Sequence, residues 1–365
     1  MLDPMDPLTH LMTGAVLART GFNRKAAYAT AAMTLAAEAP DLDVLWFIKG
    51  PIAAFQHHRG WTHALIGLPL EAAVVVGALW LFHRWRLKQS KPIKQTAPPS
   101  GSPARSLAGV SIHWPRLYLF SLIALLSHLL LDFTNNYGLR PFFPFNPRWY
   151  SASIVFIFEP VIFLLLLAAL VAPALFGLVG NEVGARRSPF HGRGWAIAAL
   201  TGIVALWGLR AVERQKALQL AQSADYNNAP VLRVAANPYP MNPFRWQTIV
   251  ETPLTYRLAT ADTFNSTLAT SPQADVFHKP PTTLATLVAK RSWLGEVYLD
   301  WSPYPLVTDT GADPDGLTTV TFRDLRFMYE TTFFSGREKP PLSGAVYIND
   351  DRRIDHMEMD GHAQP

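Results

Sequence analysis

The sequence predicts a mainly α-helical protein in which a multi-helix transmembrane bundle precedes a C-terminal β-rich, extracytoplasmic domain. Of its 365 residues, 49% are hydrophobic and only 16% are charged, and soluble domains usually have a charged fraction of roughly 25%. Residues 1–212 contain nearly all the long apolar runs, whereas residues 225–365 have the mixed composition of a soluble domain. We therefore expect a membrane-embedded, metal-binding helical domain over 1–212 and a separate β-rich domain over 225–365.

The helical part is expected to contain several spanning segments. Three apolar runs are close to or above the roughly 20 residues that cross a bilayer, namely 64–82, 153–179 and 195–211. A fourth run, 117–133, is slightly shorter and contains His128 and Asp132. Two stretches, 8–18 and 26–37, are too short to span alone. We expect them to form a re-entrant helical hairpin, because backbone at membrane depth is tolerated where it is packed in protein.

The basic residues indicate an orientation. They concentrate in a Pro/Ser-rich linker at about 84–116 and again between residues 181 and 194. Loops rich in Lys and Arg stay in the cytoplasm, so both segments are expected there. The loops at 38–63 and 134–152, and everything after about residue 213, then face the other side. In a multi-pass protein of the bacterial inner (cytoplasmic) membrane, that side is the periplasm or exterior.

The C-terminal part contains alternating, strand-like runs separated by Pro, Gly and Asp, which is typical of a small β-rich domain. The runs are Trp246–Glu251, Leu254–Ala259, Leu294–Trp301, Leu317–Phe322, Arg326–Phe333 and Gly344–Ile348. Their order in a sheet does not follow from the sequence.

Composition and motifs exclude several kinds of chemistry. The chain has no cysteine, which excludes disulfides, thiolate zinc sites and a cysteine nucleophile, so any metal must be held by His, Asp or Glu. The formal charge of +5 does not indicate nucleic-acid binding, because the basic residues lie mainly in short loops beside apolar segments. No phosphate-binding loop, dinucleotide fingerprint or Gly-x-Ser-x-Gly elbow is present.

Four clusters of ionisable residues fall on the same predicted side of the membrane. Their members are Asp6 and His10; Glu38, Asp41 and Asp43; His57, His58 and His63; and His128 and Asp132. Thr9 and Thr62 directly precede a histidine, and threonine is a good helix N-cap. We therefore expect His10 and His63 each to open an apolar helix at the membrane mouth. Each cluster alone has an ordinary interpretation as a loop, a turn or an interfacial residue, but their shared side favours a metal site.

The fourth cluster is the most informative. His128 and Asp132 are four residues apart and so share one helix face. They lie in an apolar segment, where ionisable side chains are costly and usually functional. A hydrogen bond between helices is the structural alternative. Imidazole together with carboxylate suits Zn, Mn, Fe or Ni, so this pair predicts a divalent metal.

Three motifs resemble those of a known family. They are Pro-Asp-Leu-Asp at 40–43, His-Arg-Gly-Trp-Thr-His at 58–63, and the run from His128 through Asp132 and Asn135 to Tyr137 and Gly138. The sequence resembles bacterial inner-membrane metal-dependent hydrolases, a family whose domain is largely of unknown function and which is distantly similar to zinc-dependent phospholipase C. The resemblance covers roughly residues 5–160, with a looser match at 242–246.

The resemblance implies a set of site residues. The candidate ligands are His10, Asp41, His63, His128 and Asp132, with Asp43, His57 and His58 as further candidates. Arg59 would clamp a phosphate or carboxylate with its fork of donors. An Asp-Pro pair is expected near the start of the third long helix, where this chain has Glu159 and Pro160. Glu159 is therefore an additional candidate ligand.

Together these features predict a membrane-bound hydrolase that uses metal-activated water, most naturally zinc-bound, on a phosphoester or lipid-linked substrate. Asp41 or Asp43 is the expected general base, and Arg59 would stabilise developing negative charge. One alternative is a non-catalytic membrane scaffold with a structural metal. A metal sensor or transporter is a second alternative, disfavoured because 65–80 and 161–179 are almost wholly apolar apart from Glu71.

Overall fold

The first elements of the protein are two short helices that fold back on each other. The computed structural model describes residues 7–89, 111–182, 192–269, 276–314, 316–329 and 340–365. The two helices are α1 (Pro7–Arg19) and α2 (Ala29–Glu38). At 1.5 Å per residue they are about 20 and 15 Å long, too short to cross a core of about 30 Å. A Cβ on Gly14 would lie 2.3 Å from the Met33 carbonyl oxygen, so only glycine permits this close packing. The predicted pair of short helices is confirmed.

The segment after α2 bears Asp41, Asp43 and three of the candidate histidines, His57, His58 and His63. It consists of three short elements, η2 (Ala39–Lys49), α3 (Pro51–His57) and η3 (Trp61–His63), followed by the long helix α4 (Leu68–Gln89). The chain bends by 86° between the α3–η3 segment and α4. The expectation that His63 opens the apolar helix is wrong, because η3 ends at His63 and α4 begins five residues later. Thr9 likewise lies inside α1 and does not precede it.

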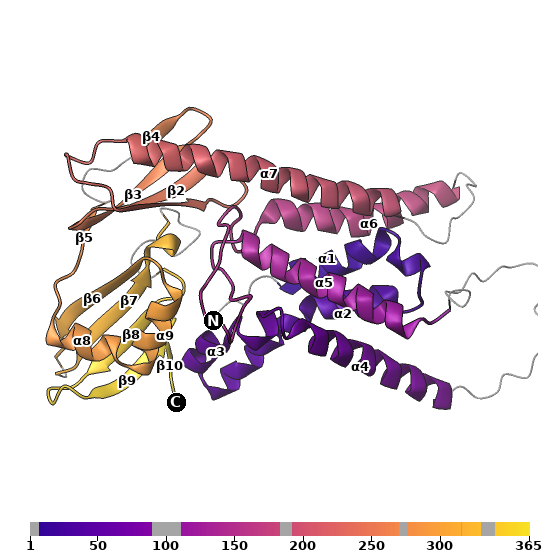
Figure 1. The fold of residues 1–365 in the computed structure, drawn as a ribbon, viewed down its shortest axis with the longest axis horizontal. Helices are drawn as coiled ribbons and strands as arrows, with labels where there is room; N and C mark the ends of the chain where they lie inside the picture. Colours follow the sequence, from indigo (N-terminus) through magenta and orange to yellow (C-terminus); the bar gives the residue numbers. More distant parts are fainter. Residues whose placement is uncertain (1–6, 90–110, 183–191, 270–275, 315, 330–339) are drawn as a thin grey trace, which may run out of the picture.

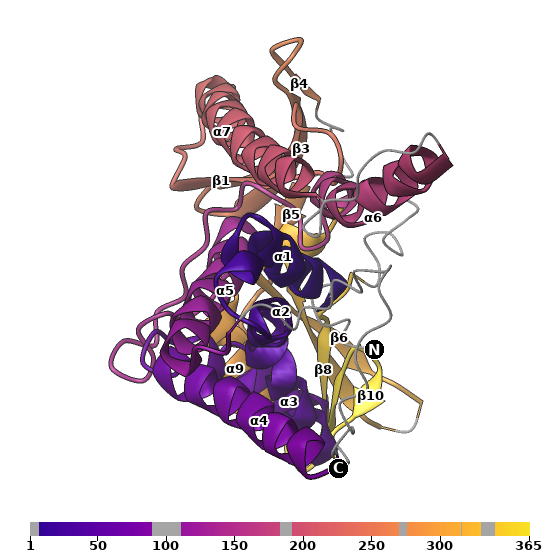
Figure 2. The same cartoon turned by 90° about the vertical axis from the view of Figure 1, so that its right-hand side faces the viewer.

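Three further helices complete the helical part. They are α5 (Trp114–Thr134), α6 (Pro160–Glu182) and α7 (Arg193–Ser223). Within the described residues, α5 and α7 are long and apolar enough to cross a membrane, and the bent pair of 51–63 with α4 would make a third crossing. The predicted run 153–179 is helical only from Pro160 onward. Figure 2 shows α1 and α2 beside α5, with α4 below them and α6 above.

Helix α7 crosses the domain boundary that the sequence predicts at residue 212. Its 31 residues correspond to about 46 Å, and its second half lies over the first β-sheet (Figure 1). There Ala217 packs against Trp246 and Ala261. The helical and β-rich parts are therefore joined by one continuous helix.

The described residues of the C-terminal part form two five-stranded sheets in which neighbouring strands pair antiparallel. The first has the order β1-β2-β3-β4, with β5 also paired to β3; its strands are β1 (Arg233–Pro238), β2 (Arg245–Glu251), β3 (Thr255–Asp262), β4 (Thr267–Ala269) and β5 (Val276–His278). The second has the order β10-β9-β8-β7-β6; its strands are β6 (Pro305–Ala312), β7 (Thr318–Asp324), β8 (Gly344–Ile348), β9 (Ile354–Met359) and β10 (His362–Ala363). Two helices, α8 (Leu284–Lys290) and α9 (Trp293–Trp301), pack on the second sheet.

Two of the predicted strands are wrong. The run Leu294–Trp301 is the helix α9, and its buried residues Leu294, Tyr298 and Trp301 follow helical spacing. Ser292 caps this helix by accepting a hydrogen bond from the Gly295 N–H at 3.1 Å. The run predicted over 326–333 begins in the short helix η5 (Leu325–Phe327), and its residues from 330 onward lie outside the described part.

The β-rich part is docked against one end of the helices (Figure 1). Trp293 of α9 donates through Nε1 to the Gln56 Oε1 atom at 3.0 Å, and Arg326 donates to the Asn136 carbonyl at 2.8 Å. The ends of α4 through α7 that lead to the basic segments are at the opposite end (Figure 1). Most of both basic segments, at 90–110 and 183–191, lies outside the described residues.

Candidate metal centre

The centre is built on one face of α5. His128 and Asp132 are fully buried on this face. The His128 Nδ1 atom lies 2.7 Å from the carbonyl oxygen of Ala37, at the end of α2. Because a carbonyl only accepts, this contact places the ring proton on Nδ1 and leaves the Nε2 lone pair free. A hydrogen bond of this kind on the far nitrogen is typical of histidines that bind metal.

His63 faces the same point from the opposite side. Its Nδ1 atom lies 3.0 Å from the Thr62 hydroxyl and 3.4 Å from a carboxylate oxygen of Asp43. Since a carboxylate only accepts, Nδ1 carries the proton here too. The Nε2 atoms of His63 and His128 are 3.0 Å apart. Two lone pairs at this separation repel each other, so a proton or a metal cation belongs between them.

Two carboxylate oxygens complete this arrangement. Asp41 Oδ1 lies 3.4 Å from the His63 Nε2 atom and 3.6 Å from the His128 Nε2 atom. Asp132 Oδ2 lies 3.3 and 3.5 Å from the same two atoms. A tetrahedron with metal–ligand bonds of 2.0–2.1 Å has edges of about 3.3–3.4 Å, so these spacings fit one small cation. The Asp132 Oδ2 atom is buried without a hydrogen-bond partner.

His10 of α1 adjoins this tetrahedron. Its Nε2 atom is 3.5 Å from Asp132 Oδ1, and its ring lies over that of His128 with centroids 3.9 Å apart. Ligand atoms of His10, Asp41 and His128 lie within 4.8 Å of one another, as do those of His63, His128 and Asp132. Both triplets include His128, which offers only Nε2. Because one Nε2 atom binds one cation, the two triplets share a single metal position at His128 and are not two independent sites.

The charge of the cluster also favours a cation. Three carboxylates of this cluster, those of Asp41, Asp43 and Asp132, are buried. Burial alone would raise the pKa of Asp41 and of Asp43, but the positive charge of the neighbouring histidines outweighs it and lowers both pKa values. Without a metal, this balance requires protonated imidazoles. A divalent cation bound at the imidazole nitrogens would supply the positive charge in place of those protons.

Asp43 contacts the ligand residues from outside the centre. Its Oδ2 atom accepts the Arg59 backbone N–H at 2.8 Å, and its Oδ1 atom is 3.1 Å from the His58 Nδ1 atom. The same carboxylate faces the Nδ1 atom of His63. Asp43 and His58 therefore lie next to the ligand residues and are not themselves part of the metal position.

Arg59 has a similar role. It is fully buried and has a left-handed backbone with φ of 55°. Its Nη2 atom donates to Asp132 Oδ1 at 2.9 Å, while Nη1 donates to the Gly138 carbonyl and to the Asn135 Oδ1 atom. The guanidinium also lies over the Tyr137 ring, 4.7 Å from its centroid. The expected substrate clamp is thus engaged in fixing Asp132.

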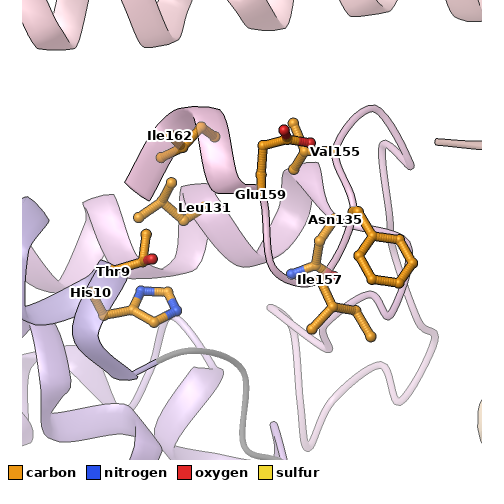
Figure 3. Close-up of a pocket in the computed structure, with 9 residues that line it drawn as sticks. Thr9, His10, Leu131, Asn135, Val155, Ile157, Glu159 and Ile162 are labelled. Carbon is orange, nitrogen blue, oxygen red and sulfur yellow. The ribbon is translucent and has the colours of Figure 1, made fainter. Parts of the chain in front are cut away.

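A small cavity lies beside the centre, next to His10. Its lining residues are Thr9, His10, Leu131, Asn135, Val155, Phe156, Ile157, Glu159 and Ile162 (Figure 3). The Glu159 carboxylate is bound by the Arg210 Nη2 atom at 2.8 Å and by the Met241 N–H at 3.1 Å. Arg210, fully buried in α7, also donates to the Tyr239 carbonyl at 3.2 Å. Glu159 therefore joins α6, α7 and the first β hairpin.

The structure brings five of the predicted ligands together: His10, Asp41, His63, His128 and Asp132. His57 is elsewhere, stacked on Trp46 with ring centroids 3.9 Å apart, and Asp6 lies outside the described residues. Sequence reasoning missed Arg210, although a charged residue in an apolar helix is itself a signal for a buried partner.

Comparisons with known proteins match the helical part. A family model described as the YdjM inner membrane protein matches residues 5–217, a range that includes all five clustered residues and Arg210. The uncharacterized protein YfhP of Bacillus subtilis (strain 168) is 26% identical over 174 residues, which are 46% of this chain and 45% of that protein. The chain thus spans less than half the length of this relative. No solved structure matches.

Proposed function

The chain belongs to the YdjM inner membrane protein family, and we propose that it is a membrane-bound hydrolase that depends on one divalent cation. His63, His128, Asp41 and Asp132 would hold the cation, with His10 as a fifth ligand. The observation that carries this proposal is the set of five donor–donor distances of 3.0–3.6 Å. Zinc is the proposed metal, because it is commonly bound by His nitrogen and Asp oxygen in tetrahedral geometry.

A bound cation would act as a Lewis acid toward a phosphoryl or acyl oxygen and lower the pKa of water. Asp41 is the proposed general base, because its Oδ2 atom is buried without a hydrogen-bond partner while Oδ1 faces the histidines. Asp43 would hold His63 in the correct tautomer, and Arg59 would fix Asp132. Both become positioning residues in this account, in place of the general base and the clamp that the sequence suggested.

A lipid-linked phosphoester is the proposed substrate class. His128 and Asp132 lie in the last two turns of α5, a helix long enough to span a bilayer, so the centre would be near the membrane surface. The cavity next to His10 combines polar groups with an apolar wall formed by Leu131, Val155 and Ile162. The chemistry of this lining would match a polar headgroup carried on an apolar chain, and at about 30 Å³ the cavity would have to widen from room for water to admit one.

The test is hydrolysis of a panel of phosphoesters and phospholipids by the purified full chain. We expect turnover that is abolished by chelation and restored by zinc, and that is lost in Asp41→Asn. Asp351→Asn, an exposed carboxylate of the β-rich part, is the matched control and should keep full activity. Turnover that survives complete metal removal would refute the proposal.

A structural metal is the second candidate. The observation that favours it is burial, since His63, His128 and Asp132 have no exposed surface and structural zinc sites are closed by protein ligands. In that case the purified chain would contain metal, chelation would unfold it, and no phosphoester of the panel would be cleaved.

A further inference from the structure

The η2 segment, which supplies Asp41 and Asp43, has two different faces. Pro40, Asp41 and Asp43 are buried toward the metal centre. The other face is apolar and open: Leu42 is 60% exposed, Leu45 61% and Ile48 84%. Residues 44–48 contain no polar side chain at all. An exposed apolar run of this kind marks an interaction surface.

The contact of Asp41 with α5 fixes the depth of this segment. The 21 residues of α5 correspond to about 31 Å, close to the thickness of the bilayer core. His128 lies six residues before the end of α5, about 9 Å inside it, and its Nε2 atom is 3.6 Å from Asp41 Oδ1. If α5 spans the membrane, η2 lies level with its last turns, at the edge of the apolar core.

The exposed face of η2 is also continuous with apolar surface of the neighbouring elements. Exposed apolar side chains follow η3 and then α4; they are Trp61, Leu65, Ile66, Leu70, Val74 and Leu81. At the end of η2, the Lys49 ammonium lies over the Trp46 ring, 4.6 Å from its centroid. Tryptophan and lysine side chains with apolar stems and polar tips are typical of the membrane–water boundary.

We propose that η2 is a lipid-contacting segment, inserted through Leu42, Leu45 and Ile48 into the bilayer on the side of the metal centre. The occupant of this face is the bilayer, because η2 contacts η3 and α4, whose exposed side chains are also apolar, and α4 is part of a candidate span. The inference goes beyond the proposed function, since it holds whether or not the centre is catalytic.

The absence of cysteine makes a direct test available. Single cysteines at Ile48 and Leu45 in the full chain, each carrying a spin label in phosphatidylglycerol/phosphatidylethanolamine vesicles, report accessibility to oxygen and to a water-soluble nickel chelate. Val74→Cys on α4 is the lipid-facing control, and Asp351→Cys is the aqueous control. We expect the ratio of oxygen to nickel accessibility at 48 and 45 to match that at 74 and to exceed that at 351.

Two results would overturn the proposal. A ratio at 48 and 45 equal to that at 351 would place η2 in water. Exclusion of both reagents together with spin–spin broadening would show that a second copy covers the face. Variants are compared only after size-exclusion profiles match that of the unmodified chain, so a folding defect is detected separately.

Discussion

Asp132 is the residue of the centre whose placement in an apolar helix costs the most free energy. A carboxylate at the middle of a membrane helix costs roughly 2.5–3.5 kcal/mol on insertion scales, and the cost is smaller near the helix end. The Arg59 guanidinium donates to one Asp132 oxygen at 2.9 Å and offsets its charge. The other oxygen faces the imidazoles of His63 and His128. Breaking a buried pair by removing one partner is strongly destabilising, so Arg59 and Asp132 act as one unit.

Asp43→Asn tests the positioning role at this scale. Asparagine can still accept the Arg59 N–H, but it no longer offers a charged acceptor to the His63 Nδ1 atom. Loss of such an outer partner typically weakens metal binding about 10–100-fold, and we expect zinc affinity to fall by that amount. Competition with a fluorescent chelator measures it, with Asp351→Asn as the control. Unchanged affinity would remove Asp43 from the site.

The sequence predicts some of these residues well and others poorly. His128 and Asp132 could be found because they are polar residues at helical spacing within an apolar run. The different roles of His57 and His58 could not, because they depend on where α3 ends: His57 is its last helical residue and stacks on Trp46, whereas His58 is the non-helical C-cap and contacts Asp43. The partner of Glu159 lies 51 positions away, at a distance that no local pattern reveals.

At the scale of elements, the Glu159–Arg210 pair joins α6 and α7 to the β-rich part. Arg210→Met would leave a buried carboxylate without its cation, and loss of one partner of a buried pair costs about 3–5 kcal/mol. We expect a drop of this size in the free energy of unfolding, measured by denaturant titration in detergent.

The double variant Glu159→Gln with Arg210→Met is the control for that measurement, because it removes both charges together. It should recover a substantial part of the loss. A single variant as stable as the wild type would show that the pair does not hold these elements together.

How well the sequence predicts a helix or strand depends on which contacts stabilise it. Apolar length alone located α4, α5 and the first half of α7. The second half of α7 could not be found in this way, because it is amphipathic and is helical through the contact of Ala217 and Ala221 with the first sheet. The buried residues of α9 have helical spacing, and the alternation of apolar and polar residues in so short a run wrongly predicts a strand. Sheet order depends on pairings such as that of β3 with β5, which join runs separated in sequence.

At the scale of the whole molecule, the β-rich part lies at the end of the helices where α5 finishes, after His128 and Asp132, and the helix ends that lead to the basic segments lie at the other end (Figure 1). The positive-inside rule then predicts that the metal centre faces the periplasm. Reporter fusions at residues 145 and 300 should be active only with a periplasmic reporter, and a fusion near residue 100 only with a cytoplasmic one. Cytoplasmic activity at 145 or 300 would contradict this topology.

Metal content tests the central claim most directly. The shared Nε2 atom of His128 predicts about one divalent ion per chain, measured by elemental analysis of the purified protein. Asp132→Asn keeps the size of the side chain and an oxygen that can accept from Arg59 but removes the charge, so it should lose most of this metal while it still inserts into the membrane fraction, although loss of the buried ion pair lowers its stability. Equal metal content in the two proteins, or a wild type that binds none when zinc is supplied, would contradict a metal centre at these residues.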